Sequence, residues 1–393
     1  MPMLTETALS AYISTQLLRI APRLTTHPRI AQPRLSGHWK DVWGLDSMEL
    51  MELAAFFHAQ FQMLQGSVEN YLLQYHQPEE WLAALGRCVQ DEQLPLVFQT
   101  SGSTGLPKAC SHTKARLRQE VDFLATLMPG ARRVWRLVPP HHIYGFLFTV
   151  LLPDHLGLPV EDARTQAWPR LLQALQPGDV VVGHPLWWQN WAQQGLPWPA
   201  GCLGINSTGP LAPAAEAYLA GQPGRFILVY GSSETSGIGF RHPGEAAYTL
   251  FPYLRPGEEG LILTQPDGVE QEIPLMDHLQ WQDARHFVLS GRKDQAVQVG
   301  GYNVFPAQIA RRLAQRPGVR QAWVRPMLPE EGNRLKAWVV PEPGTEVESL
   351  RADLFAWIEA NLTVPERPRD LIVADQPPLD GVGKVREWSL STQ

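Results

Sequence analysis

Thr100-Ser101-Gly102-Ser103-Thr104-Gly105-Leu106-Pro107-Lys108 lies just after an apolar run, residues 94–98. These nine residues include four hydroxyl side chains, two glycines and one lysine. A strand that opens into such a loop presents backbone N–H groups, hydroxyls and a cation to one small volume, which is the chemistry that binds a polyphosphate. The stretch therefore predicts a nucleotide-binding loop.

This loop differs from the common P-loop, in which Ser or Thr follows a Gly-Lys pair. Here Leu106 and Pro107 separate Gly105 from Lys108, and Ala109 comes next. Gly, Ser and Thr alone are equally typical of a plain flexible connection. The rest of the chain must decide between these two interpretations.

Four further motifs carry polar residues suited to nucleotide chemistry. They are Pro139-Pro140-His141-His142-Ile143-Tyr144-Gly145; Tyr230-Gly231-Ser232-Ser233-Glu234-Thr235; Gly291-Arg292-Lys293-Asp294 with Val297-Gln298-Val299-Gly300-Gly301-Tyr302-Asn303-Val304; and Gly383-Lys384. Singly, each could be a buried histidine, a solvated acid or a turn. In this order they resemble the adenylate-forming (AMP-binding) superfamily of acyl- and aryl-CoA synthetases, over residues 94–386. In character the chain is closest to small bacterial aryl-acid ligases of aryl-polyene and xanthomonadin-type pathways, which act on CoA or a carrier protein.

The resemblance implies a role for each motif. The implied nucleotide-binding residues are Thr100, Ser101, Gly102, Ser103, Thr104, Gly105, Lys108, Tyr230, Gly231, Ser232, Ser233, Asp277 and Arg292. Catalytic roles fall to His142, Glu234 and the mobile Lys384, and Glu234 also binds Mg²⁺. Gly301 would line the passage for a pantetheine thiol. The implied cofactors are ATP, Mg²⁺ and the thiol of CoA or of a phosphopantetheine arm.

The implied reaction is ATP-dependent activation of a carboxylic acid through an acyl-adenylate, followed by thioester formation on CoA or on a carrier protein. This makes the chain an acid–thiol ligase with an acyl carrier protein as an expected partner. An aromatic or conjugated acid is expected because aromatic side chains should gather at the acid pocket, and flat rings pack well on them. Those side chains are His142, Tyr144, Phe146, Trp187 and Trp188.

Two other functions stay open. An amino-acid-activating adenylation domain needs a carboxylate for the substrate ammonium, and residues 182–188 offer none. A non-catalytic carrier-interaction protein of the same fold would be favoured by loss of Lys108, Glu234 or Lys384, yet all three are present. Three departures from the family pattern, Gln298, Asn303 and Gln308, leave the thiol acceptor less well defined than the adenylation step.

The pattern of apolar runs predicts an α/β fold with mainly parallel strands. The expected strands are 94–98, 134–138, 179–182, 203–205 and 226–229, and the expected helices are 114–128, 145–156, 166–175, 186–193 and 213–220. Such a sheet binds ligands at the carboxyl ends of its strands, where loops 100–108, 206–210 and 230–235 should meet. After Asp294 a small α+β unit follows, which the resemblance identifies as the mobile C-terminal domain.

The expected domains are an N-terminal helical part (1–90), an AMP-binding core (91–293) and the small C-terminal domain (294–393). Within the first part, Gly44-Leu45-Asp46-Ser47-Met48-Glu49-Leu50 resembles the phosphopantetheine site of an acyl carrier protein. The alternative, which we favour, is that Asp46 and Glu49 form a helix capping box.

Composition narrows the class of protein. The net charge of −6 gives no basic excess, which argues against nucleic acid as a partner. The three cysteines lack metal-ligand spacing, and the N-terminus lacks the pattern of a signal peptide. Since the longest apolar run is too short to span a bilayer, we expect a cytoplasmic protein without a membrane partner.

Overall fold

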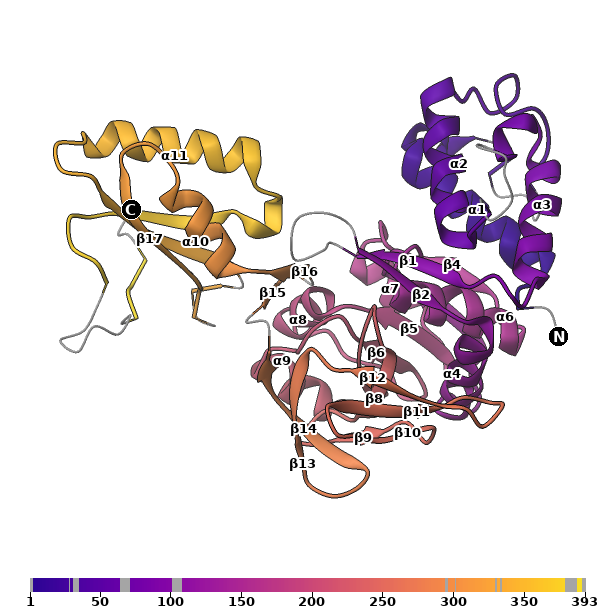
Figure 1. Ribbon diagram of the computed structural model, residues 1–393. Coiled ribbons are helices and arrows are strands. Elements are labelled where there is room, and N and C mark those ends of the chain that lie inside the picture. The colour runs from indigo at the N-terminus through magenta and orange to yellow at the C-terminus, as the bar shows by residue number, and fades with distance from the viewer. Residues whose placement is uncertain are drawn as a thin grey trace. The chain divides into compact units, whose positions relative to one another are not determined.

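The structure is a computed structural model that places the chain in two compact units (Figure 1). It describes residues 3–27, 29–30, 35–63, 71–100, 108–293, 296–300, 302–328, 331–332, 334–378 and 387–390. The first unit comprises Met1–Thr100, Pro107–Leu275 and Trp281–Val288, and the second includes Met276–Gln280 and Leu289–Gln393. Within the described ranges, no helix is both long and apolar enough to cross a membrane.

Helices form the N-terminal part of the first unit. They are α1 (Glu6–Ile20), η1 (Pro22–Thr26), α2 (Ser47–Phe61), η2 (Tyr71–Gln74) and α3 (Pro78–Gln90). The aromatic ring of Tyr12 on α1 packs edge-on against Phe146, with ring centroids 5.1 Å apart. Arg136, from the central sheet, donates a hydrogen bond to Thr15 of α1. These helices therefore belong to the same compact unit as the sheet that follows them.

A capping box starts α2. The Asp46 carboxylate accepts from the Glu49 backbone N–H at 2.8 Å, and the Glu49 carboxylate accepts from the Asp46 N–H at 3.0 Å. Arg23 holds Glu49 in an ion pair and donates to the Gly44 carbonyl. The Asp46-Ser47-Met48-Glu49 sequence thus has a structural explanation in the helix cap, as we expected.

A nine-stranded sheet forms the centre of the first unit. In order its strands are β13 (Asp277–Trp281), β14 (His286–Arg292), β9 (Tyr248–Leu250), β8 (Ser236–Arg241), β7 (Arg225–Ser232), β6 (Leu203–Asn206), β5 (Asp179–Gly183), β3 (Arg133–Arg136) and β4 (Val160–Asp162). Strands β4, β3, β5, β6 and β7 run parallel, whereas β7, β8, β9 and β14 pair antiparallel. The expected α/β class is confirmed, and the parallel strands β3, β5, β6 and β7 were predicted, whereas β4 was not.

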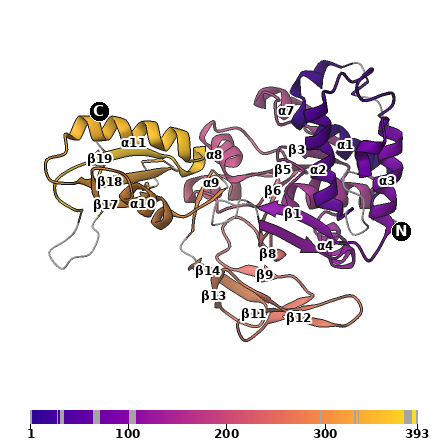
Figure 2. The same cartoon turned by 45° about the horizontal axis from the view of Figure 1, so that its top comes forward.

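Helices follow the strands of the parallel half, as the sequence pattern indicated (Figure 2). Those after β2 and the parallel strands are α4 (Lys114–Thr126), α5 (Ile143–Phe146), η3 (Leu147–Leu151), α6 (Leu152–Leu156), α7 (Trp168–Ala174), α8 (Pro185–Gln193) and α9 (Pro213–Ala220). A smaller antiparallel sheet of β10 (Leu254–Pro256), β11 (Gly260–Thr264) and β12 (Glu270–Pro274) completes the first unit. We did not predict this sheet, although β11 contains the apolar run Leu261-Ile262-Leu263.

The strand before the expected nucleotide loop lies outside the parallel sheet, contrary to our expectation. It is β1 (Leu96–Thr100), and it pairs antiparallel with β2 (Lys108–His112) in a separate two-stranded sheet. Thr100 stands opposite Lys108 in the register. The connection of seven residues is short enough to join antiparallel neighbours, whereas a parallel pair needs a much longer crossover. Residues 101–107 themselves lie outside the described residues.

The aromatic residues expected to line an acid pocket mostly belong to the core, which corrects our expectation. Trp188 is fully buried and packs against Trp198 and Phe226, at ring distances of 5.2 and 4.4 Å. Trp187 stacks on Trp191 at 4.9 Å at the edge of the same cluster. Phe146 is also fully buried and touches the β1 side chain Phe98. Their physical role is packing between the sheet and its helices.

The second unit contains a three-stranded sheet with helices against it. Its elements are β15 (Val297–Val299), β16 (Tyr302–Val304), α10 (Pro306–Ala314), β17 (Val319–Pro326), β18 (Leu335–Pro341), α11 (Val347–Asn361), η4 (Val364–Glu366) and β19 (Pro368–Val373). Because side chains alternate along a strand, Leu335, Ala337 and Val339 of β18 face one side. There they join the cluster that buries the apolar stripes of α10 and α11. This matches the small α+β unit expected after Asp294.

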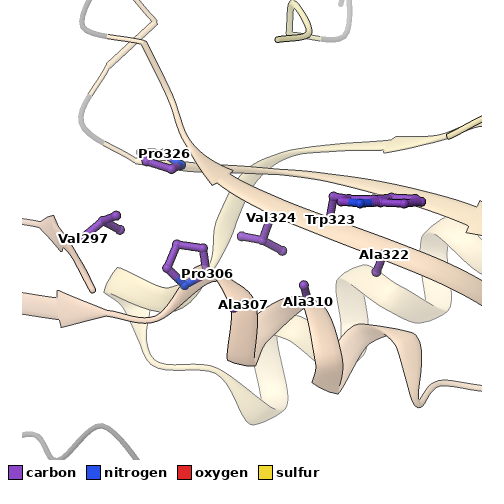
Figure 3. A pocket seen from close by; sticks show the side chains of 8 residues that line it. All are labelled: Val297, Pro306, Ala307, Ala310, Ala322, Trp323, Val324 and Pro326. Carbon is purple, nitrogen blue, oxygen red and sulfur yellow. The ribbon is translucent and has the colours of Figure 1, made fainter. Parts of the chain in front are cut away.

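An apolar hollow of about 420 Å³ lies beside α10 in the second unit (Figure 3). It is lined by Val297, Pro306, Ala307, Ala310, Ala322, Trp323, Val324 and Pro326. The lining has no acid, base or nucleophile, so it offers no catalytic chemistry.

We predict that Ser47 is a helix residue and not a carrier site. After co-expression with a broad-specificity phosphopantetheinyl transferase, the intact mass of the protein should be unchanged, because the capping box accounts for the Asp46-Ser47 sequence. An acyl carrier protein expressed in parallel serves as the positive control. A mass gain that disappears in Ser47→Ala would establish the carrier interpretation.

Candidate active site

The turn between β7 and β8 carries most of the Tyr230–Thr235 motif and is tightly built. At Gly231 the register shifts, and a Cβ built there would lie 2.3 Å from the Ser236 carbonyl oxygen. Inside the turn, the Thr235 N–H donates to Ser232 Oγ at 3.1 Å and the Ser232 N–H donates to Thr235 Oγ1 at 3.2 Å. The glycine and the two hydroxyls therefore fix the backbone on both sides of Glu234.

Three side chains from β2 and α4 clamp this turn from outside the motif. His112 Nε2 donates to the Ser233 carbonyl at 2.7 Å, and Arg116 donates to the Thr235 carbonyl. Glu120 Oε1 accepts from the Gly237 N–H at 2.9 Å. His112 and Glu120 are almost fully buried, where a polar group left without its hydrogen-bond partner is unfavourable. The clamp ties the turn to the hairpin that flanks the expected nucleotide loop.

Burial sets the protonation of the clamp. It lowers the pKa of His112 to about 4, helped by the nearby charge of Arg116, so this imidazole is neutral at neutral pH. Burial likewise raises the pKa of Glu120. A neutral His112 with its proton on Nε2 matches the bond to the Ser233 carbonyl, because the other ring nitrogen, Nδ1, has no hydrogen-bond partner within the described ranges.

Lys108 and Glu234, separated by 126 residues in the chain, meet at this place. Lys108 Nζ lies 3.4 Å from Glu234 Oε1, and the two side chains are 61% and 35% exposed. An ion pair this exposed contributes roughly 0–1 kcal/mol. A nucleotide can therefore separate the pair at little cost, drawing the ammonium to phosphate oxygens and leaving the carboxylate for a metal ion.

Tyr230 stands at the end of β7 beside two other aromatic rings. Its ring centroid lies 5.7 Å from both Tyr248 and Phe287, and Tyr248 stacks on Phe287 at 5.6 Å. Arg241 lies over the outer face of this group, 5.1 Å from the Tyr248 centroid. Supported in this way, the half-buried Tyr230 presents a fixed flat surface on which a base could stack.

The histidine motif begins α5 at the carboxyl ends of two parallel strands. The Tyr144 hydroxyl lies 2.9 Å from the Gly183 carbonyl of β5 and 3.2 Å from the Ile205 carbonyl of β6. Gly145 lacks the Cβ that would lie 2.0 Å from the Pro139 carbonyl oxygen, so the helix can start close to the preceding turn. His142 occupies the N-cap position of this helix without a side-chain capping hydrogen bond, and the residue is exposed. The next ring, His141, lies 4.2 Å away.

The loop after β6 is strained at the same edge of the sheet. Thr208 has φ of +73° and Ser236 has φ of +56°; among the described non-glycine residues, Gln62 is the other one with positive φ. Asn206 is buried, and its Nδ2 donates to the Gly209 carbonyl at 3.1 Å. Strain of this kind costs on the order of 1–3 kcal/mol per residue and clusters at functional sites. Its position fits loop 206–210 as part of the site.

The remaining expected site residues are described only in part. Ser101, Gly102, Ser103, Thr104, Gly105, Gly301 and Lys384 lie outside the described residues, as do the hinge residue Asp294 and the side chains of Thr100 and Arg292. Asp277 begins β13 in the second unit and is half-buried. Gln298 and Asn303, two departures from the family pattern, face each other across β15 and β16, and Gln298 donates to the Asn303 side chain.

Sequence reasoning missed the clamp residues His112, Arg116 and Glu120. They follow the nucleotide loop closely, yet no motif includes them. The structure shows that Cys110 and His112 of β2 face inward while Ser111 between them is exposed. Their spacing of two residues was a weak signal that both lie on one face of a strand. A buried histidine needs a hydrogen-bond partner, although the sequence could not show which carbonyl supplies it.

Two family models match the chain. The model of the family described as AMP-binding enzyme matches residues 58–261, and that of the AMP-binding enzyme C-terminal domain matches residues 308–384. The two matched ranges include four of the five motifs, and the motif at residues 291–304 lies between them. The chain belongs to the AMP-binding enzyme family, and it is an enzyme of the AMP-forming acid–CoA ligase type.

The relatives that match over most of this chain are named as acid–CoA ligases. The chain is 35% identical over 356 residues to a 4-coumarate–CoA ligase of Rhodobacter capsulatus, covering 88% of this chain and 90% of that one. It is 34% identical over 345 residues to a 4-coumarate–CoA ligase of Halorhodospira halophila, covering 87% of each chain. A 4-chlorobenzoate–CoA ligase of a Pseudomonas species is 25% identical over 359 residues, covering 75% of this chain and 65% of that one.

Solved structures share the fold at lower identity. An o-succinylbenzoate CoA synthetase from Bacillus subtilis matches with a TM-score of 0.60 and 16% identity, over 74% of this chain and 67% of that one. A malonyl-CoA ligase matches with a TM-score of 0.58 and 23% identity, over 73% and 72% of the two chains. Both confirm the large α/β part with a small C-terminal domain.

We predict that Gly231→Ala destabilises the protein by about 1–3 kcal/mol, the range for overpacking a tight site. The added methyl would meet the Ser236 carbonyl and force the turn apart. Urea unfolding measures the loss. Gly86→Ala is the matched control, because nothing lies within 4 Å of its added Cβ inside helix α3. Equal stability of the two variants would contradict the tight turn.

We also predict acid sensitivity from His112. Its pKa is about 4 in the folded protein against 6.5 when unfolded, so the unfolded state binds more protons between these values. Stability is complete above pH 6.5 and falls as the pH drops toward 4. Between pH 7 and pH 5 this residue alone should account for about 2 kcal/mol. Urea unfolding of wild type and His112→Gln at both pH values measures the part of the pH dependence that comes from His112. If both proteins lose the same stability between pH 7 and pH 5, the lowered pKa of His112 is contradicted.

Proposed function

We propose that this chain activates an aromatic or conjugated carboxylic acid with ATP and transfers the acyl group to CoA. The observation that carries the proposal is the meeting of Lys108 and Glu234 at the end of β7. A cation for phosphates and a hard carboxylate for Mg²⁺ stand together there, although 126 residues separate them in the chain. Near-full-length similarity to three ligases named for 4-coumarate and CoA supports the same function.

Nucleotide binding would use the residues around the turn. Lys108, with the loop before it, holds the β- and γ-phosphates, and Tyr230 offers its flat ring to adenine. Glu234 suits Mg²⁺, which commonly takes one or two protein carboxylates and completes its shell with phosphate oxygens and water. Such a metal ion would offset phosphate charge. Asp277 and Arg292 would bind the ribose hydroxyls.

The first half-reaction joins two anions. An acid oxygen attacks the α-phosphorus of ATP, the bond to the β-phosphate oxygen breaks, and pyrophosphate leaves with that electron pair. The barrier is largely electrostatic, so fixed positive charge and alignment contribute most. Lys384 would bridge the acid and the α-phosphate as charge builds, while His142 borders the acid.

In the second half-reaction the thiol of CoA attacks the acyl carbon and AMP leaves, giving the thioester. Gly301 would leave room for the pantetheine arm because it has no Cβ. We take CoA as the acceptor because the relatives are named as CoA ligases. The Gln298–Asn303 pair, which stands in place of two commonly charged residues, lies in this part of the chain.

A hydroxycinnamate is the proposed acid, since three relatives are named for 4-coumarate. The proposal no longer depends on Trp187 or Trp188, which pack in the core. We also propose that the enzyme works in the cytoplasm, where ATP and CoA are supplied.

Pyrophosphate release with a panel of acids tests the function. We expect 4-coumarate to exceed saturated fatty acids and amino acids by at least tenfold in kcat/KM, about 1.4 kcal/mol in transition-state binding. CoA and a phosphopantetheinylated carrier protein are then compared as acceptors for the product adenylate. A fatty acid that exceeds 4-coumarate tenfold would overturn the substrate class, and no release with any acid would overturn the function.

Lys384→Ala is the matched variant for this assay. It should lose pyrophosphate release by at least a hundredfold and still convert chemically supplied acyl-adenylate to thioester, because its charge acts in the first half-reaction. Near-normal release in the variant would remove Lys384 from the mechanism.

A further inference from the structure

A lysine is buried on the sheet face opposite α10 and α11. Lys336 lies on β18 between Leu335 and Ala337, whose side chains join the helix-covered core, so its own side chain points to the other face. Its exposed fraction is 0%. A lysine is almost never fully buried unless it is paired, and this position therefore needs partners.

All three donors of the Lys336 ammonium have an acceptor. Nζ lies 2.7 Å from Glu331 Oε2, 2.5 Å from Glu387 Oε1 and 2.6 Å from the Trp388 carbonyl oxygen. The Trp388 ring lies 5.6 Å from the same nitrogen and is itself almost fully buried. Two of these partners come from the last residues of the chain, more than fifty positions beyond Lys336.

Neighbouring groups complete the cluster. Arg325, opposite Lys336 in the β17–β18 register, pairs with Glu387 at 3.1 Å, and its guanidinium lies 5.7 Å from the Trp388 ring. Trp338 meets Trp388 edge-on at 5.9 Å. Two cations face two carboxylates, so the charges balance. Lys336 is the fully buried charge among them, so its two carboxylate partners offset the cost of burying it.

The cluster fixes the chain directly beyond Lys384. Glu387 and Trp388 follow this lysine by three and four residues, and a chain spans at most about 3.3–3.6 Å per residue. Few covalent links therefore separate this lysine from the residues that the anchor holds. Catalytic groups lose much of their effect when they are displaced by as little as 1 Å.

We propose that Lys336, with Glu331, Glu387 and Trp388, is a positioning anchor for the adenylation lysine. Lys336 touches no substrate; it acts by holding the end of the chain to β18. The proposal rests on the proposed function, in which Lys384 serves the first half-reaction. Loss of the anchor should therefore lower kcat for adenylate formation, leave KM for ATP and acid unchanged, and spare thioester formation from supplied adenylate.

The test compares Lys336→Met and Trp388→Ala with wild type in pyrophosphate release. Each should lower kcat at least tenfold, and the double variant should be no more than threefold worse than the poorer single one, because both remove one unit. Hydrogen exchange of peptides covering the last residues should rise in both variants. Val339→Ala, on the opposite face of the same strand, is the control for general destabilisation.

The outcomes separate the anchor from the function. A kcat within twofold of wild type, a change confined to KM, or an equal kcat loss in Val339→Ala at matched Tm would each overturn the anchor. If Lys336→Met does not fold, Trp388→Ala and Glu387→Gln decide by the same criteria. If wild type releases no pyrophosphate, the proposed function fails, and unchanged exchange at the chain end in the variants would overturn the anchor on its own.

Discussion

The backbone contact between Gly231 and Ser236 is the constraint on which the site depends. The backbones of β7 and β8 approach so closely here that no Cβ fits at residue 231. Buried side chains of β2 and α4 hold the turn from outside. One result is the fixed position of Glu234. Another is that the hairpin beside the nucleotide loop and the end of the parallel sheet form one rigid part of the molecule.

This site combines a buried set of hydrogen bonds, the clamp, with an exposed ion pair between Lys108 and Glu234. The clamp is mostly buried, and leaving a buried donor or acceptor without its partner costs about 1–3 kcal/mol. The Lys108–Glu234 pair is exposed and contributes roughly 0–1 kcal/mol. The charged pair can therefore separate at little cost while the clamp holds the turn that presents Glu234.

Expectations that rested on local apolar runs were correct, whereas those that required knowing the packing partner were wrong. The strands 179–182, 203–205 and 226–229 were predicted well because buried parallel strands are continuous apolar runs. The first strand was assigned to the wrong sheet, since the polar β2 sequence gives little sign that β1 pairs with it. Trp187 and Trp188 were assigned to a pocket because residue type shows that a side chain packs, but not what it packs against.

The sequence by itself determined the class of this protein: the loop with Lys108, the Tyr230–Thr235 motif and the order of all five motifs indicate an adenylate-forming α/β enzyme. Tertiary structure alone decided which residues meet. Lys108 joins Glu234 across 126 residues, His112 joins Ser233 across 121, and Lys336 joins Trp388 across 52. Motifs are local because a turn or a phosphate cradle needs neighbouring residues, whereas these contacts depend on strand register and packing, which many distant residues set together.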